Sequence, residues 1–270
     1  MKPKILIPAH KEAAYIGSLL HALPSQTCEP IVLANGCEDE TAGIASAYGA
    51  TVFETEQPGK MPAVQDALRR LGRNALERPI LMTDADSVPV MPRQWPDRLT
   101  RLALREAQRS EVGASVVAGP VLASGGVSQI SNVLRSGKRF VRQLAFMTYD
   151  PSQVIWCGAN MAMQLGTEDQ LEAILGLPHY WPGEDLAMAD TLSAMGARAT
   201  QSVMPQSAVL QSARYYPPIW DFRRAVPKAQ RSQAVLTSYT DRAAKGSIPY
   251  VRGEPIPAQA HAIEDLAQTG

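Results

Sequence analysis

The chain has 270 residues, a length that a single α/β domain can reach, so a tandem of independent modules is not expected. Hydrophobic residues make up 45% of it and charged residues 19%, a balance that excludes a disordered chain and supplies a core. Lys plus Arg and Asp plus Glu both number 26, which excludes a global field that would draw the whole molecule to nucleic acid or a membrane.

Targeting and redox signals in the sequence favour a cytoplasmic protein. The first ten residues hold only a three-residue apolar run, too short for a secretory signal. The most apolar region, 112–127, is broken by four glycines, a proline and two serines and falls short of the roughly 20 residues needed to cross a bilayer. Cys28, Cys37 and Cys157 lack the spacing of a zinc site or a disulfide framework. We therefore expect reduced thiols and no transmembrane segment.

Short apolar runs alternate with amphipathic stretches through the first third of the chain, the pattern of βαβ units that build a parallel sheet. The pattern predicts strands at 5–7, 31–33, 51–53 and 80–83. Between them it predicts helices at about 16–23, 41–48 and 64–71, which would end at Pro24, Gly49 and Gly72.

The second half of the chain is less regular. Strands are predicted at 116–118 and 154–156, an amphipathic helix at about 128–147, and a further helix at about 185–195 that ends before Gly196. Four basic residues share one face of the 128–147 helix at i, i+3, i+4 and i+7: Arg135, Lys138, Arg139 and Arg142. The Pro-containing segment 214–252 has eight basic and two acidic residues, a net charge of +6. These charges are either solvated surface or a local patch that attracts an anion.

Polar residues follow each of the four strands predicted in the first third, at 8–12, 35–41, 59–60 and 84–86. In open α/β sheets, ligands bind beyond the carboxyl ends of the strands, so these residues are candidates for a site. Asp84 and Asp86 stand one residue apart after a buried strand, where two carboxylates can hold a divalent cation. The alternative is a turn whose Asp side chains cap backbone amides. The position at the end of a parallel strand favours the metal.

A set of short motifs recurs in order along the chain. They are Ile-Pro-Ala-His-Lys-Glu at 7–12, Asn-Gly-Cys-Glu-Asp-Glu-Thr at 35–41, Gly-Lys at 59–60, Asp-Ala-Asp at 84–86, Gly-Ala-Asn at 158–160, Gly-Glu-Asp-Leu at 183–186 and Gln-Ser-Ala-Arg-Tyr at 211–215. In this order the chain resembles the family 2 glycosyltransferases of the GT-A fold over roughly residues 4–215.

The resemblance implies a Rossmann-like α/β fold of the GT-A type, with a mostly parallel central sheet flanked by helices. We expect one domain over 1–270. Within it, 1–110 would be the nucleotide-sugar-binding half, 111–213 the acceptor and catalytic half, and 214–270 a basic, Pro-containing C-terminal extension.

The resemblance also implies a nucleotide-diphosphate sugar donor and a Mn²⁺ or Mg²⁺ cofactor at its diphosphate. Asp86 is expected to bind the metal directly, and Asp84 to bind the ribose or a water on the metal. Lys60 would contact the base or the phosphates, with a solvated lysine as the alternative. The full set expected around the donor is Pro8, Ala9, His10, Glu12, Asn35, Lys60, Asp84, Ala85, Gly158, Asn160, Gln211 and Arg214.

The chain departs from the family pattern in the donor turns. Asn35 stands where an Asp would accept a hydrogen bond from uracil, and an amide suits several bases, so uridine is a weaker inference. Cys37 replaces the usual Ser, Lys11 the usual Asn, and Tyr215 the usual Trp.

Inversion at the anomeric carbon needs a base that accepts the proton of the acceptor hydroxyl. By motif position Asp185 is that base, and Glu184 beside it orients the site or binds the acceptor. The alternative is that both acids only interact with the positive end of a helix, and the two roles are compatible.

Two other functions compete with an inverting glycosyltransferase. A sugar-phosphate nucleotidyltransferase also uses a metal, but it usually opens on a Gly-rich phosphate loop, and here no glycine precedes Gly17. A noncatalytic nucleotide-sugar binder would be free to lose Asp84, Asp86 and Asp185, which are present. The acceptor hydroxyl is expected on an unidentified molecule. If the basic segments contact it, it is anionic: a lipid carrier at the membrane periphery, a glycan or a nucleic acid.

Overall fold

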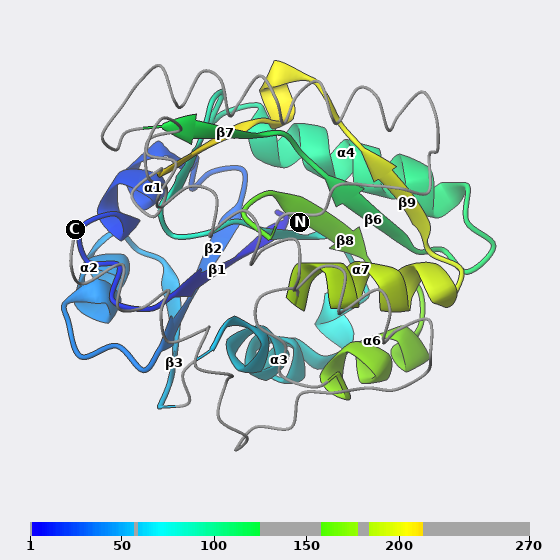
Figure 1. Ribbon diagram of the computed structural model, residues 1–270, viewed down its shortest axis with the longest axis horizontal. Helices are drawn as coiled ribbons and strands as arrows, with labels where there is room; N and C mark the ends of the chain where they lie inside the picture. Colours follow the sequence, from blue (N-terminus) through cyan, green and yellow to red (C-terminus); the bar gives the residue numbers. More distant parts are fainter. Residues whose placement is uncertain (1, 57–58, 125–157, 178–183, 213–270) are drawn as a thin grey trace, which may run out of the picture.

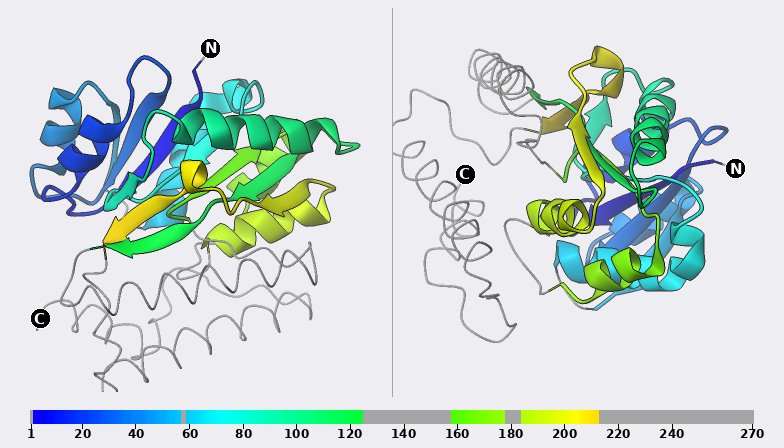
Figure 2. Two further views of the ribbon diagram at one scale, coloured as in Figure 1. Left: turned by 90° about the horizontal axis from the view of Figure 1, so that it is seen from above. Right: turned by 90° about the vertical axis from the view of Figure 1, so that its right-hand side faces the viewer.

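The computed structural model describes residues 2–56, 59–124, 158–177 and 184–212, which form a sheet between two layers of helices (Figure 1). On one face lie α1 (Ile16–Ala22), α2 (Thr41–Ala47) and α4 (Trp95–Gln108). The other face is covered by α3 (Lys60–Leu71), α6 (Glu168–Leu175) and α7 (Glu184–Ala194). Figure 2 shows α4 and α7 on opposite sides of the sheet.

The main sheet has seven strands in the order β3-β2-β1-β4-β8-β6-β9. Only β8 runs antiparallel to its neighbours, β4 and β6, so the sheet is mostly parallel, as predicted. The strands are β1 (Lys4–Ala9), β2 (Glu29–Asn35), β3 (Thr51–Thr55), β4 (Ile80–Met82), β6 (Ser115–Ala118), β8 (Met161–Gln164) and β9 (Arg198–Gln201).

A second sheet of three strands places the Asp-Ala-Asp segment. It has the order β5-β10-β7, with β5 (Ser87–Pro89), β10 (Val209–Ser212) and β7 (Val121–Ser124). Residues 84–86 follow β4 of the main sheet closely and lead directly into β5, so they lie where the chain passes from one sheet to the other.

Both faces of the central strands are buried, which explains why the strands read as unbroken apolar runs. In β1, Leu6 packs on the side of α3, whereas Ile5 and Ile7 pack on the side of α1 and α4. In β4, Met82 and Leu81 divide in the same way. The alternation of successive side chains therefore builds two cores on one sheet.

The predicted elements of the first third are all present with shifted ends, and the predicted strand at 116–118 is part of β6. Gly49, Gly72 and Gly196 follow helical segments with positive φ angles of 77°, 52° and 87°, a backbone region open to glycine. The helix predicted at 128–147 and the strand at 154–156 lie outside the described residues. The short helices η1 (Gly72–Ala75) and η2 (Pro205–Ser207) complete the fold. No helix in the described ranges is both long and apolar enough to span a membrane.

Candidate active site

Charged and polar groups from separate segments meet near the end of β4. Lys60 is the first residue of α3, Asp84 follows β4, and Glu184 and Asp185 begin α7. The Lys60 ammonium lies 2.6 Å from Asp84 Oδ1 and 3.7 Å from Glu184 Oε1. The lysine therefore bridges the sheet edge and the α7 N-terminus, and the Lys60 and Glu184 side chains are only 16% and 9% exposed.

The environment of Lys60 keeps its charge in place. Burial alone would lower the pKa of Lys60, because a buried ammonium loses hydration. Three nearby carboxylates, led by Asp84, outweigh burial and raise that pKa. Lys60 is thus a fixed cation in the site.

Both carboxylate oxygens of Asp84 have partners. Oδ1 accepts from Lys60, and Oδ2 accepts from Gln211 Nε2 of β10 at 2.9 Å. The backbone of the same turn is also tied to β10, because Ser212 N donates to Asp86 O at 3.0 Å. The Asp84–Asp86 turn is therefore held from α3 on one side and from the small sheet on the other.

The two acids of α7 differ in surroundings. Asp185 Oδ2 accepts a hydrogen bond of 2.6 Å from the backbone N–H of Gly158. Burial raises the pKa of Glu184, the Lys60 charge opposes that rise, and the neighbouring Asp185 charge adds to it. Glu184 consequently holds its proton to higher pH than an ordinary glutamate does.

Gly158 lies close to the Lys60 side chain, where any added side chain would press against the ammonium. An added Cβ would lie 2.5 Å from Lys60 Nζ and 3.4 Å from the Asp185 Cβ. Since the ammonium is already held by two carboxylates, it cannot move aside without breaking those contacts. The Gly-Ala-Asn motif thus contributes space and one backbone donor to the cluster.

Asn35 joins the loops that follow the first strands. Its Nδ2 donates to the carbonyls of Ala9 and Leu33, and its Oδ1 accepts from Gly59 N at 3.1 Å. The side chain is buried, so these three contacts use most of its hydrogen-bonding capacity. His10 is exposed beside it, with Nδ1 2.7 Å from Asn35 O. This geometry presents His10, rather than the Asn35 amide, at the surface of these loops.

The turn that follows β1 is held by Asp39 and Thr41, two residues absent from the predicted site. Asp39 Oδ1 accepts from Thr41 N and Oγ1, Asp39 Oδ2 accepts from Ala13 N, and Thr41 Oγ1 accepts from Glu12 N. Burial opposes charge on Asp39, but the hydrogen bonds from Thr41 and Ala13 outweigh it and lower the pKa of Asp39. The acidic and hydroxyl residues of the 35–41 motif are the sequence feature from which Asp39 and Thr41 could have been identified.

The Asn160 side chain has partners outside this cluster. Its side chain is fully buried, accepts from Trp95 Nε1 at 3.0 Å, and donates to the carbonyls of Pro120 and Ser207 at 2.8 and 2.7 Å. Both amide hydrogens of Asn160 already bind carbonyls, so in the present conformation the side chain has no free N–H for a nucleotide sugar. Asn160 thus links three distant segments in the described structure, and its contact with the nucleotide sugar stays a prediction.

The other predicted residues divide by position. Pro8 and Ala9 end β1, and Ala85 is buried in the apolar core, so they present backbone rather than side-chain chemistry. Arg214 lies outside the described residues.

Asp84 and Asp86 supply two carboxylates for the predicted metal. Within the described ranges, no three His, Cys, Asp or Glu side chains gather as a metal-binding group. Mg²⁺-type sites commonly use only one or two carboxylates and take their remaining ligands from substrate phosphates and water. With Asp84 held by Lys60 and Gln211, the two-carboxylate turn fits a site completed by a diphosphate.

Comparisons with known proteins agree with this fold. No family model matches the chain. A segment is 37% identical over 86 residues to the 4,4'-diaponeurosporenoate glycosyltransferase of Staphylococcus aureus, which covers 30% of this chain and only 23% of that protein. The chain thus matches less than a quarter of this relative's length.

Crystal structures of glucosyl-3-phosphoglycerate synthase from Mycobacterium tuberculosis are similar over most of the chain. The complex with Mn²⁺, UDP-glucose and glycerol 3-phosphate gives a TM-score of 0.51 at 18% identity and covers 92% of this chain and 81% of that one. A second structure of the enzyme gives 0.50 at 18% identity, with 84% and 78% covered. The chain therefore has the predicted α/β fold of the GT-A type.

Proposed function

We propose that the protein is an inverting glycosyltransferase that moves a sugar from a nucleotide-diphosphate sugar to an acceptor hydroxyl. The observation that carries the proposal is the cluster of Lys60, Asp84 and the Glu184–Asp185 pair beside the Asp86 turn. It unites a fixed cation, two carboxylates suited to a metal, and two further acids. The S. aureus relative is named a glycosyltransferase, and the similar crystal structure contains UDP-glucose and Mn²⁺.

Mn²⁺ or Mg²⁺ bound by Asp86, with Asp84 contributing through ribose or water, would neutralise charge on the departing diphosphate. Lys60 adds a permanent positive charge on the same side, because its pKa is raised. Its present contacts with Asp84 and Glu184 orient the ammonium. A donor phosphate would compete with these carboxylates for Lys60.

Asp185 is proposed as the general base. In the transfer step the acceptor oxygen forms a bond to the anomeric carbon, the bond from that carbon to the diphosphate breaks, and the hydroxyl proton passes to Asp185. The Gly158 N–H fixes one oxygen of this carboxylate. Glu184, whose carboxylate lies 3.7 Å from the Lys60 ammonium, serves to orient Lys60 and the acceptor.

The geometry of the turn after β1 favours a glycosyltransferase over a nucleotidyltransferase. The backbone amides of Glu12 and Ala13 are held by the Thr41 and Asp39 side chains, and the turn at 8–13 holds no glycine. A phosphate loop of the nucleotidyltransferase kind would need small residues that let backbone amides approach the phosphates. A noncatalytic binder remains the second alternative, and turnover distinguishes it from an enzyme.

The acceptor is proposed to be anionic and the protein to act in the cytoplasm, including at the membrane periphery. The basic groups at 135–142 and 214–252 support this, although they lie outside the described residues. The similar crystal structure contains glycerol 3-phosphate. Charge recruitment predicts an apparent KM for acceptor that rises with salt. A salt-independent KM would point to a neutral acceptor.

A panel of nucleotide sugars tests the proposed function. Each is added with Mn²⁺ to the full chain, and the melting temperature and the release of nucleoside diphosphate are measured. A true donor binds the native state and raises its stability with ligand concentration, and turnover follows when an acceptor is supplied. Stabilisation without nucleotide release under any acceptor would favour the noncatalytic binder, and release of pyrophosphate from a sugar phosphate and a nucleoside triphosphate would favour the nucleotidyltransferase.

A further inference from the structure

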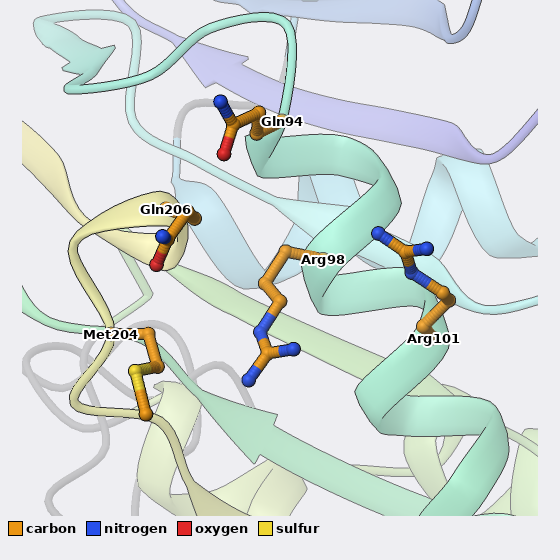
Figure 3. A pocket seen from close by; sticks show the side chains of 5 residues that line it. All are labelled: Gln94, Arg98, Arg101, Met204 and Gln206. Carbon is orange, nitrogen blue, oxygen red and sulfur yellow. The ribbon is translucent and has the colours of Figure 1, made fainter.

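A pocket of about 420 Å³ opens between α4 and the η2 turn, on the face of the sheet opposite α3 and α7 (Figure 3). Gln94, Arg98 and Arg101 line it from α4 and its N-cap, and Met204 and Gln206 line it from η2 and its N-cap. The lining among the described residues contains four side chains that donate hydrogen bonds and no acidic group.

Arg98 is the residue in this lining whose charge has no counterpart. Its Nε is buried and has no hydrogen-bond partner within the described part of the chain. Arg101, one turn along, is paired with Asp97 instead. Figure 3 shows the Arg98 side chain extending from α4 toward the η2 turn. An arginine does not lose its proton in a protein, so the pocket holds a permanent positive charge.

A buried donor without a partner costs free energy, and such groups in native proteins call for a specific explanation. A bound anion supplies one. The guanidinium fork matches the geometry of a phosphate or carboxylate better than any other side chain does. The Gln94 and Gln206 amides provide further donors at the rim, and the Met204 side chain provides an apolar wall.

We propose that the pocket between α4 and η2 binds a small molecule that carries an oxyanion, a phosphate or a carboxylate, with Arg98 as its principal ligand. The pocket volume falls within the range of about 300–1,000 Å³ that small-molecule sites occupy. The proposal is independent of the proposed transfer reaction, because none of its residues belongs to the Lys60 cluster.

Titration of the ¹⁵N-labelled full chain with inorganic phosphate tests the proposal. Sodium chloride is adjusted to hold ionic strength constant, because salt alone screens exposed charges. We expect saturable shifts of the backbone amides at 94–101 and 204–206, apart from Pro96 and Pro205, which carry no amide proton. An equal titration with malonate distinguishes a phosphate site from a carboxylate site. Shifts that rise linearly without saturation for both probes would overturn the proposal.

Two variants assign the effect to Arg98. Arg98→Gln is expected to weaken the apparent affinity roughly 10-fold or more, the loss typical of one charged hydrogen bond. Arg93→Gln removes the same charge from an exposed residue just before α4 that does not line the pocket, and it should change affinity less than about 2-fold by screened charge alone. Equal weakening in both variants would indicate general charge attraction and overturn the site. Melting curves of each variant confirm that it folds.

A third variant separates this site from the proposed donor site. Lys60→Gln should weaken binding of a nucleoside diphosphate with Mn²⁺ but leave the phosphate-induced shifts at 204–206 unchanged. Arg98→Gln should weaken the phosphate-induced shifts but leave the binding of a nucleoside diphosphate with Mn²⁺ unchanged. Loss of the 204–206 shifts in Lys60→Gln would show that phosphate acts through the Lys60 cluster and would refute the separate pocket.

Discussion

Gln211 donates a hydrogen bond of 2.9 Å to Asp84, a residue 127 positions earlier in the chain. The contact links β10 of the small sheet to the turn that follows β4 of the main sheet. Together with the Lys60 contact to the other oxygen, it fixes the rotation of the Asp84 carboxylate. Gln211, which the motif resemblance placed around the nucleotide-sugar donor, therefore contacts the proposed metal turn through Asp84.

Replacing Gln211 by Leu should loosen Asp84 without removing it. We expect kcat/KM to fall on the order of 10-fold to 100-fold, as for a lost hydrogen bond to a charged group, and the Mn²⁺ concentration for half-maximal activity to rise. Leu210→Ala, at an exposed neighbour on the same strand, is the matched control. An unchanged Mn²⁺ dependence in Gln211→Leu would remove the positioning role.

The Gln211 contact also illustrates what sequence alone cannot provide. Strands such as β1 and β4 were predicted because their apolar residues are adjacent in sequence and buried on both faces. The β8 strand, Met-Ala-Met-Gln, contains no β-branched residue, and its only polar residue is the last one, Gln164. Neither β-propensity nor an alternating pattern therefore indicates a strand here. Its identity comes from pairing with β4 and β6.

The same reasoning applies to the site. Asp84 and Lys60 were identified because each follows a predicted strand, and parallel strands end at one edge of the sheet. The role of Asn160 depends on Trp95, Pro120 and Ser207, which come from three distant segments. A motif gives the residue type, but only packing shows whether its amide faces a ligand or the core.

Gly158→Ala tests the close packing around Lys60. The added methyl group would lie 2.5 Å from the ammonium, so it should displace Lys60 from Asp84 and lower donor affinity and kcat/KM. Gly176→Ala is the control, because its added Cβ would meet no atom closer than 3.4 Å and its φ is not positive. Donor binding equal to wild type in Gly158→Ala would show that Lys60 does not contribute to the donor site.

Asp86→Ala tests the proposed metal ligand. Since Ser212 contacts the backbone oxygen of Asp86, the turn should remain attached to β10 and the melting temperature should change little. Activity should fall on the order of 10²-fold or more, because a metal supplies several kcal/mol of charge stabilisation. Asp169→Ala, at an exposed aspartate of α6, should retain activity. Full turnover of Asp86→Ala in the presence of a chelator would contradict metal dependence.

Alkaline pH should destabilise the fold through Cys28. Burial raises the pKa of this thiol from 9.0 to about 11. Above pH 9 the unfolded chain releases the thiol proton while the folded chain still holds it, so the free energy of unfolding falls as the pH rises toward 11. Denaturant titrations of wild type and Cys28→Ala should show a steeper fall in the wild type. Cys37→Ala, which leaves the buried thiol in place, should retain the wild-type slope, and parallel curves for all three proteins would contradict the assignment.

Asp185→Asn should separate donor binding from transfer. The side-chain oxygen of the introduced asparagine can still accept from Gly158 N, so the geometry of the α7 N-terminus should persist, but an amide cannot take a proton. The rate of transfer should fall on the order of 10² to 10⁴-fold, the contribution of a positioned general base, while donor affinity stays near that of the wild type. Asp190→Asn is the control on the same helix, since Asp190 is exposed and lies more than one turn beyond Asp185. A loss of donor affinity with an unchanged rate per bound donor would move Asp185 from catalysis to binding.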